Sequence, residues 1–132
     1  MRFRVLRLTI LPIAYMGLLY YLSSIPGNQG DEDMTQHLLQ WVSPNVQNLL
    51  HIPLYALLAW LWCRALGAWP MRVAAIAPTA LLVTITYGAF NEWQQIGVPG
   101  RYPSFTDVLL NGFGGGVGSW FYLHQKAPFQ CS

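Results

Sequence analysis

The side chains that could carry chemistry in this chain gather near the ends of its apolar segments. His51 opens the second such segment, Glu92 closes the third, and Asp107 precedes the fourth. A histidine and two carboxylates can transfer protons as general acid and base, and one carboxylate can orient the imidazole. We therefore predict His51, Glu92 and Asp107 as the candidate catalytic residues.

Each of these candidates is followed by a second polar residue, three or four positions later. The pairs are His51/Tyr55, Glu92/Gln95 and Asp107/Asn111. Residues at these spacings share one face of a helix. Three segments thus each present a polar pair at a comparable depth, which predicts one convergent polar site.

The connection between the third and fourth segments carries Pro99-Gly100-Arg101 and, shortly after, Ser104. A guanidinium is a planar fork that fits phosphate or carboxylate, which a lysine cannot copy. We predict a ligand-binding set composed of Arg101, Tyr55, Gln95, Asn111 and Ser104. Arg101 is its expected anchor for an anion.

Purely structural roles for these residues stay open at this point. Ser104-x-x-Asp107 matches the capping-box pattern before an apolar run, and a cap is compatible with a site. Arg101 could contact lipid phosphates, and Tyr55 could belong to an interfacial aromatic belt. Gln95 and Asn111 could form interhelical hydrogen bonds. Neither belt nor cap explains Glu92 and His51, so their alternative is a structural network with Arg101.

The composition shows what kind of protein must position these side chains. The chain has 132 residues, of which 54% are hydrophobic and 9% charged, and its mean hydropathy is +0.33. An average soluble domain carries about 25% charged residues. These values exclude a small soluble domain and a disordered chain, and a net charge of +2 gives no reason to expect a nucleic-acid partner.

The apolar runs come in lengths that suit membrane spans, which need about 20 mostly apolar residues. We predict helices at about 5–22, 49–66, 73–91 and 108–123. Prolines within or beside these runs are tolerated in membrane helices when neighbours satisfy the freed carbonyl. The predicted fold is an all-α, integral membrane four-helix bundle that forms a single domain over residues 1–132.

The first run has a basic front that resembles a signal peptide. Its exit, Tyr21-Leu22-Ser23-Ser24-Ile25-Pro26, lacks a small-x-small cleavage site, and its apolar stretch is long for a signal core. We therefore expect an uncleaved membrane anchor.

The distribution of charge predicts the orientation of the four spans. Six of the seven basic residues fall on one side: Arg2, Arg4, Arg7, Arg64, Arg72 and Lys126. The remaining one, Arg101, falls on the other side with all five acidic residues. Because basic loops stay in the cytoplasm, both termini are predicted to be cytoplasmic, in a multi-pass protein of the inner membrane.

The first outer loop, residues 23–48, contains apolar residues near a 3.6-residue period between Met34 and Val42. Asp33 and Gln36 resemble a capping box before this pattern. We predict a short amphipathic helix on the outer leaflet, with His37 as a solvated residue.

Two further features predict structure rather than chemistry. Cys63 and Cys131 both map to the reducing side, so we expect no disulfide. The glycine-rich fourth segment contains two small-xxx-small pairs, Gly112/Gly116 and Gly114/Gly118, which favour close helix approach.

The ordered motif of the second half resembles the signature of the VanZ-like family. It reads Glu92-x-x-Gln95-x-x-x-Pro99-Gly100-Arg101-x-x-Ser104-x-x-Asp107-x-x-x-Asn111-x-x-Gly114-x-x-x-Gly118, with His51-x-x-x-Tyr55 and Ser23-Ser24-x-Pro26 upstream. Asn48 stands where the family commonly has a lysine, so an anion held by that lysine would have to be held differently here. The resemblance implies a small bacterial membrane protein, from a family named for a member associated with teicoplanin resistance.

Three functions fit these observations. The first is an enzyme that modifies a membrane lipid or a lipid-linked amphiphile at the outer face; for binding or modification of such a molecule, the resemblance implies a link to the cell envelope or to glycopeptide-antibiotic tolerance. The second is a non-catalytic protein that binds such an amphiphile, and the third is a small oligomeric transporter. We predict no cofactor and no metal, because one histidine and two carboxylates at unknown distances are weak evidence for a metal.

Overall fold

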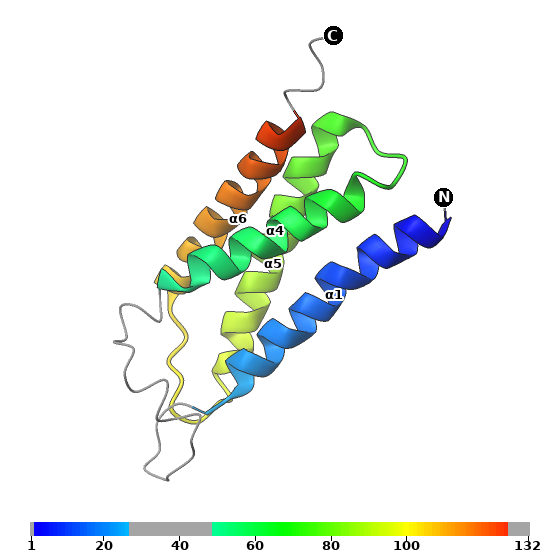
Figure 1. The fold of residues 1–132 in the computed structure, drawn as a ribbon. Coiled ribbons are helices and arrows are strands. Elements are labelled where there is room, and N and C mark those ends of the chain that lie inside the picture. Colours follow the sequence, from blue (N-terminus) through cyan, green and yellow to red (C-terminus); the bar gives the residue numbers. More distant parts are fainter. Residues whose placement is uncertain (1, 27–48, 127–132) are drawn as a thin grey trace.

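The structure, a computed structural model, describes residues 2–26 and 49–126, and all regular structure in these ranges is helical (Figure 1). The helices are α1 (Arg2–Ser24), α4 (His51–Leu66), α5 (Val73–Gln95) and α6 (Phe105–Lys126). The predicted all-helical fold with four long helices is therefore confirmed. The predicted amphipathic helix with its Asp33/Gln36 cap lies outside these ranges, as do His37, Asn48 and Cys131.

Three of the four helices extend beyond the apolar runs from which they were predicted. The sequence predicts an end at residue 91 for the third helix, whereas α5 continues to Gln95. α6 begins at Phe105 rather than at residue 108, and α1 covers 2–24 rather than 5–22. An apolar run marks only the apolar part of a helix, while backbone hydrogen bonding continues through the polar residues at its ends.

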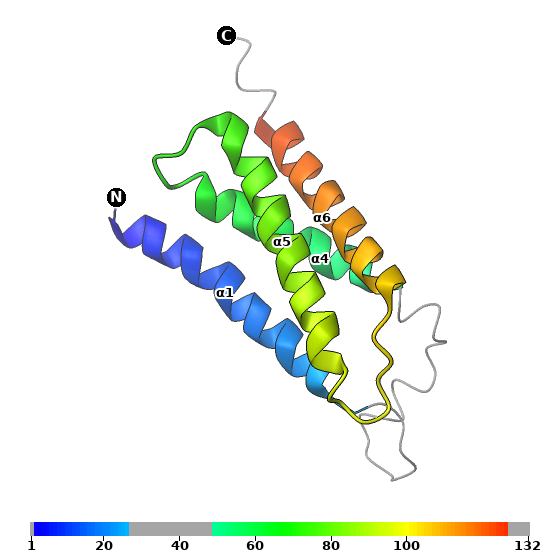
Figure 2. The same cartoon turned by 180° about the vertical axis from the view of Figure 1, so that it is seen from behind.

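Consecutive helices run in opposite directions, and the two views agree on their arrangement (Figures 1 and 2). α4 packs most extensively against α6, while α5 packs against both of them. α1 lies against α4 and, less extensively, α5. The C-terminal ends of α1 and α5 therefore lie at the same end of the bundle as the N-terminal ends of α4 and α6.

Two glycines of α6 allow it to approach α4 closely. A Cβ atom at Gly114 would clash with the backbone carbonyl of Ile52, and one at Gly118 with that of Ala56. The pair Gly114/Gly118 thus behaves as a small-xxx-small contact. The prediction is wrong for Gly112/Gly116. Among the described residues, a Cβ at Gly116 would meet nothing within 4 Å, and one at Gly112 would make only an ordinary contact with the Ile85 side chain at 3.7 Å, because these glycines lie on other faces of α6.

Two helices are long and apolar enough to cross a membrane, namely α1 over Phe3–Ser24 and α5 over Val73–Gln95. α4 has only 16 residues, which span about 24 Å. Each helix still exposes large apolar side chains, for example Ile13, Leu57, Leu82 and Phe113. An apolar exterior of this kind is typical of a surface that faces lipid.

Candidate functional site

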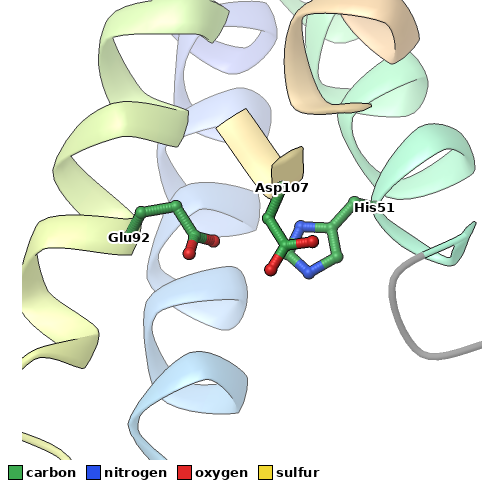
Figure 3. Close-up of side chains that lie close together, drawn as sticks. All are labelled: His51, Glu92 and Asp107. Atoms are coloured by element: carbon green, nitrogen blue, oxygen red, sulfur yellow. The ribbon is translucent and has the colours of Figure 1, made fainter. Parts of the chain in front are cut away.

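His51, Glu92 and Asp107 converge at the end of the bundle where α4 and α6 begin and α5 ends. Each offers one nitrogen or oxygen atom, and these three atoms all lie within 4.8 Å of one another. In Figure 3 the carboxylate of Glu92 points from α5 toward the side chains of Asp107 and His51. The helix-end spacing that predicts a shared depth for these residues therefore corresponds to a real cluster, which we call the His–Glu–Asp cluster.

The imidazole of His51 is held by the amide of Asn111. His51 Nδ1 lies 2.8 Å from Asn111 Oδ1. Because an amide oxygen only accepts hydrogen bonds, this contact requires the proton on Nδ1. In the neutral ring, Nε2 then keeps its lone pair. That lone pair is what a general base or a metal ligand needs.

The carboxylate of Glu92 connects α5 to the start of α6. The backbone N–H of Ser104 donates to Glu92 Oε2 at 3.3 Å. Ser104 also caps α6, since its Oγ accepts a hydrogen bond from the backbone N–H of Thr106 at 3.2 Å. In a complete capping box the Ser104 N–H would bond to Asp107. Here it bonds to Glu92, so Asp107 is available to the cluster.

Two oxygen atoms of the cluster are buried without a hydrogen-bond partner among the described residues. They are Glu92 Oε1 and Asp107 Oδ1. The two residues are only 4% and 7% exposed. Buried acceptors are costly when unpaired, and two neighbouring carboxylates also repel each other when both are ionised. A proton, a cation or a group of a bound ligand at this point would pair these oxygens and reduce the repulsion between the two carboxylates.

Tyr55 lies beneath the cluster and is not an interfacial aromatic residue. It is 1% exposed, and its ring stacks with that of His51 at a centroid distance of 6.1 Å. Its hydroxyl accepts a hydrogen bond from Asn91 Nδ2 at 3.2 Å. Gln95 is also buried, at 6% exposure, one turn beyond Asn91 in α5.

A hydrogen-bonded chain that the sequence did not reveal links α1 to this region. Ser23 Oγ donates to Asn91 Oδ1 (2.9 Å) and also lies 3.1 Å from Gln94 Oε1. Gln94 Nε2 in turn donates to Ser24 Oγ at 3.1 Å. The available signal was the pair of serines at the end of the first apolar run, opposite the amides that close the third.

Arg101 forms its hydrogen bonds with α1 rather than with the carboxylates. Gly100, whose φ is 73°, makes a turn in the chain immediately before Arg101. Arg101 Nε donates to Ile25 O at 3.1 Å, and a terminal nitrogen lies 3.5 Å from Leu22 O. A cation at these carbonyls is favourable because the C-terminal end of a helix is partly negative. This contact of Arg101 caps the C-terminal end of α1, a role that the sequence did not predict.

Comparison with known proteins identifies the family. The family model described as VanZ/LLP1 matches residues 8–126. The chain belongs to the VanZ/LLP1 family. No curated protein and no solved structure gives a match. The VanZ/LLP1 match covers nearly the whole chain and includes every residue of the His–Glu–Asp cluster, so the resemblance seen in the motif is confirmed.

Proposed function

We propose that this VanZ/LLP1 protein binds the polar head group of a membrane amphiphile at the His–Glu–Asp cluster. The observation that carries the proposal is the convergence of three titratable side chains from three helices on one buried point. Glu92 and Asp107 each bury a carboxylate oxygen that has no partner among the described residues, and one ligand atom of each lies within 4.8 Å of one from His51. A structural network would be expected to pair these oxygens.

A second feature of the bundle, an apolar groove, suits the apolar chain of an amphiphile. An apolar groove of about 500 Å³ lies between α1 and α5, and its lining includes Met16, Tyr87 and Phe90. Tyr87 precedes Asn91 by one helical turn. An acyl or prenyl chain would pack in this groove while its head group reaches the end of the bundle. The guanidinium of Arg101 has five N–H donors, and two of them bond to the carbonyls of Ile25 and Leu22. Donors therefore remain for an anionic group.

The proposed setting is the inner membrane, with all four helices spanning it and both termini in the cytoplasm. α4 and α6 pack beside α5, which is long enough to span, and the basic residues Arg4, Arg64 and Lys126 gather at the opposite end from the cluster. Basic residues favour the cytoplasmic side. The cluster would then open toward the outer leaflet.

Cysteine labelling tests this topology. In a Cys131→Ser background, an impermeant thiol reagent added to intact cells should label Gly97→Cys and leave Ala68→Cys unlabelled. Both positions lie in connections between helices, and a Cβ at Gly97 meets only Gln94 O, at 3.8 Å. Labelling of Ala68→Cys without Gly97→Cys would contradict the orientation.

Modification of the bound amphiphile, as opposed to binding alone, is favoured by one feature. Because Nδ1 of His51 donates to Asn111, Nε2 of the neutral ring keeps its lone pair. This nitrogen is a candidate general base. Ser104, the serine of the motif, already serves as the α6 cap. A hydrolytic reaction would therefore use water rather than a serine nucleophile. A link to envelope or glycopeptide tolerance would follow if the amphiphile is a cell-wall precursor.

Native mass spectrometry of the purified protein tests the binding proposal. We expect a co-purifying amphiphile in the parent and in His124→Gln, because His124 is exposed and its hydrogen bond within the described residues is to Trp120 O in its own helix. Retention should fall at least tenfold in His51→Gln and Glu92→Gln. Equal retention by all four proteins, or none by the parent, would refute the proposal.

A further inference from the structure

We infer that the His–Glu–Asp cluster binds a divalent transition-metal ion of the Zn²⁺ type through His51, Glu92 and Asp107. The inference deepens the proposed function, since the ion would supply positive charge for an anionic head group. The sequence gives no distances between these residues and so predicts no metal, whereas the distances in the structure give a reason to propose one.

The first argument is spacing. The three candidate ligand atoms lie within 4.8 Å of one another. Two ligands of one tetrahedral Zn²⁺ ion, each bound at about 2.0–2.2 Å, lie about 3.3–3.6 Å apart. Side-chain rotations that move a ligand atom by about 1 Å therefore suffice to bring all three atoms onto one ion. The backbone, fixed by three packed helices, need not move.

The second argument is the way in which the ligands are supported. A histidine that binds a metal almost always donates its other N–H to an oxygen acceptor, and ligating carboxylates are hydrogen-bonded in turn. His51 donates from Nδ1 to Asn111 Oδ1 at 2.8 Å, which leaves Nε2 for the ion. Glu92 Oε2 accepts from Ser104 N–H at 3.3 Å, which leaves Oε1 for the ion.

The third argument is the burial of the remaining oxygens. Glu92 Oε1 and Asp107 Oδ1 have no partner in the described part of the chain, and both residues are more than nine-tenths buried. An ion satisfies both acceptors at once and removes the repulsion between the two carboxylates. Arg101 does not fill this role, because it bonds to the carbonyls of Ile25 and Leu22.

The mixed ligand set also indicates the class of metal. Imidazole nitrogen suits Zn²⁺, Fe²⁺, Ni²⁺ or Cu²⁺, whereas Mg²⁺ and Ca²⁺ prefer ligand sets of oxygen alone. Three protein ligands leave open positions on a four- to six-coordinate ion. A phosphate or carboxylate oxygen of a head group, or a water molecule, would occupy them.

The test is calorimetric titration of Zn²⁺ into tag-free protein in detergent after chelator treatment, with Mg²⁺ as the comparison ion. We expect one Zn²⁺ per chain in the parent and in the controls His37→Gln and His124→Gln, and no comparable binding of Mg²⁺. Affinity should fall at least tenfold in Glu92→Gln and Asp107→Asn. Glu92→Gln is the sharpest variant, because the amide oxygen can still accept the Ser104 bond.

Absence of stoichiometric Zn²⁺ binding by the parent would overturn the inference, as would unchanged affinity in Glu92→Gln. A second readout guards against misfolded variants: Zn²⁺ should raise the thermal unfolding temperature of the parent and not that of a folded Glu92→Gln protein. An equal rise in both would also overturn it. If the parent retains amphiphile but no Zn²⁺, the metal inference fails alone; if it binds Zn²⁺ but no amphiphile, only the proposed function fails.

Discussion

The two ends of the helix bundle handle their charged groups in opposite ways. At one end, Glu92 and Asp107 are buried between helices, together with the half-buried His51. At the other end, Arg4, Arg64 and Lys126 are exposed around a cavity of about 450 Å³. Two of these cations cover aromatic rings of their own helices: Arg64 lies over Trp60 and Lys126 over Tyr122.

Under the proposed topology and function, the exposed basic groups orient the protein and the buried groups form the site. The basic groups then need only be on the cytoplasmic side of the membrane. Burying charged groups is expensive, at about 2.5–3.5 kcal/mol each near the centre of a bilayer. The buried charges of the His–Glu–Asp end therefore lower the stability of the fold, whereas the exposed charges of the other end do not. Substitutions at the two ends should change the stability by very different amounts.

The largest expected effect comes from breaking the close contact that holds α6, with Asp107 and Asn111, against α4. Gly118→Ala places a Cβ against the backbone of Ala56, and overpacking of this kind costs about 1–3 kcal/mol or more. The control is Gly116→Ala, where a Cβ meets nothing within 4 Å and helix propensity gains about 1 kcal/mol. Unfolding in detergent should rank Gly116→Ala at or above the parent and Gly118→Ala far below; equal stabilities would contradict the packing.

The next effect tests the support of the histidine. Asn111 is 0% exposed, and Asn111→Ala leaves His51 Nδ1–H without its acceptor. We expect a loss of about 1–3 kcal/mol in the free energy of unfolding. A loss below roughly 0.5 kcal/mol, the size of a surface substitution, would mean that the His51 contact is not formed.

The sequence predicts the cluster well because its members occupy helix ends. Helical periodicity fixes which residues share a face, and the lengths of the apolar runs fix their depth. His51, Glu92 and Asp107 come from such runs, so their meeting could be expected. The same reasoning succeeds for Gly114/Gly118 and fails for Gly112/Gly116, because periodicity does not say which face of α6 meets α4.

The partner of Arg101 could not be predicted in this way. Arg101 lies in an irregular connection, where a glycine with positive φ turns the chain and no period fixes the direction of a side chain. Its contact with Ile25 O depends on how α1 ends beside α5. The hydrogen bond from Ser23 to Asn91 depends on the same placement, which is tertiary information.

A smaller effect is expected at Arg101. Arg101→Lys keeps the charge near the end of α1 but cannot reproduce the two-point contact with Ile25 and Leu22. We expect a loss of about 0.5–1 kcal/mol in unfolding free energy and unchanged Zn²⁺ affinity. A tenfold drop in Zn²⁺ affinity would mean that Arg101 belongs to the His–Glu–Asp cluster after all.

The smallest effect is expected at the basic end. Arg4→Gln removes one exposed cation beside the cavity, so stability should change by no more than about 0.5 kcal/mol. The thermal unfolding temperature of Arg4→Gln should be close to that of the parent. A loss as large as that of Asn111→Ala would show that both ends carry structural charge networks, and the contrast between them would disappear.

The central claim, that the His–Glu–Asp cluster is a ligand site and not a structural network, is tested most directly by the sign of one stability change. The measurement is the unfolding free energy of Glu92→Gln against the parent, both freed of metal and amphiphile. Glutamine keeps the shape and the acceptor for Ser104 N–H and removes the charge that faces Asp107. We predict equal or higher stability for Glu92→Gln. A loss of about 3–5 kcal/mol, the cost of breaking a buried ion pair, would contradict the claim.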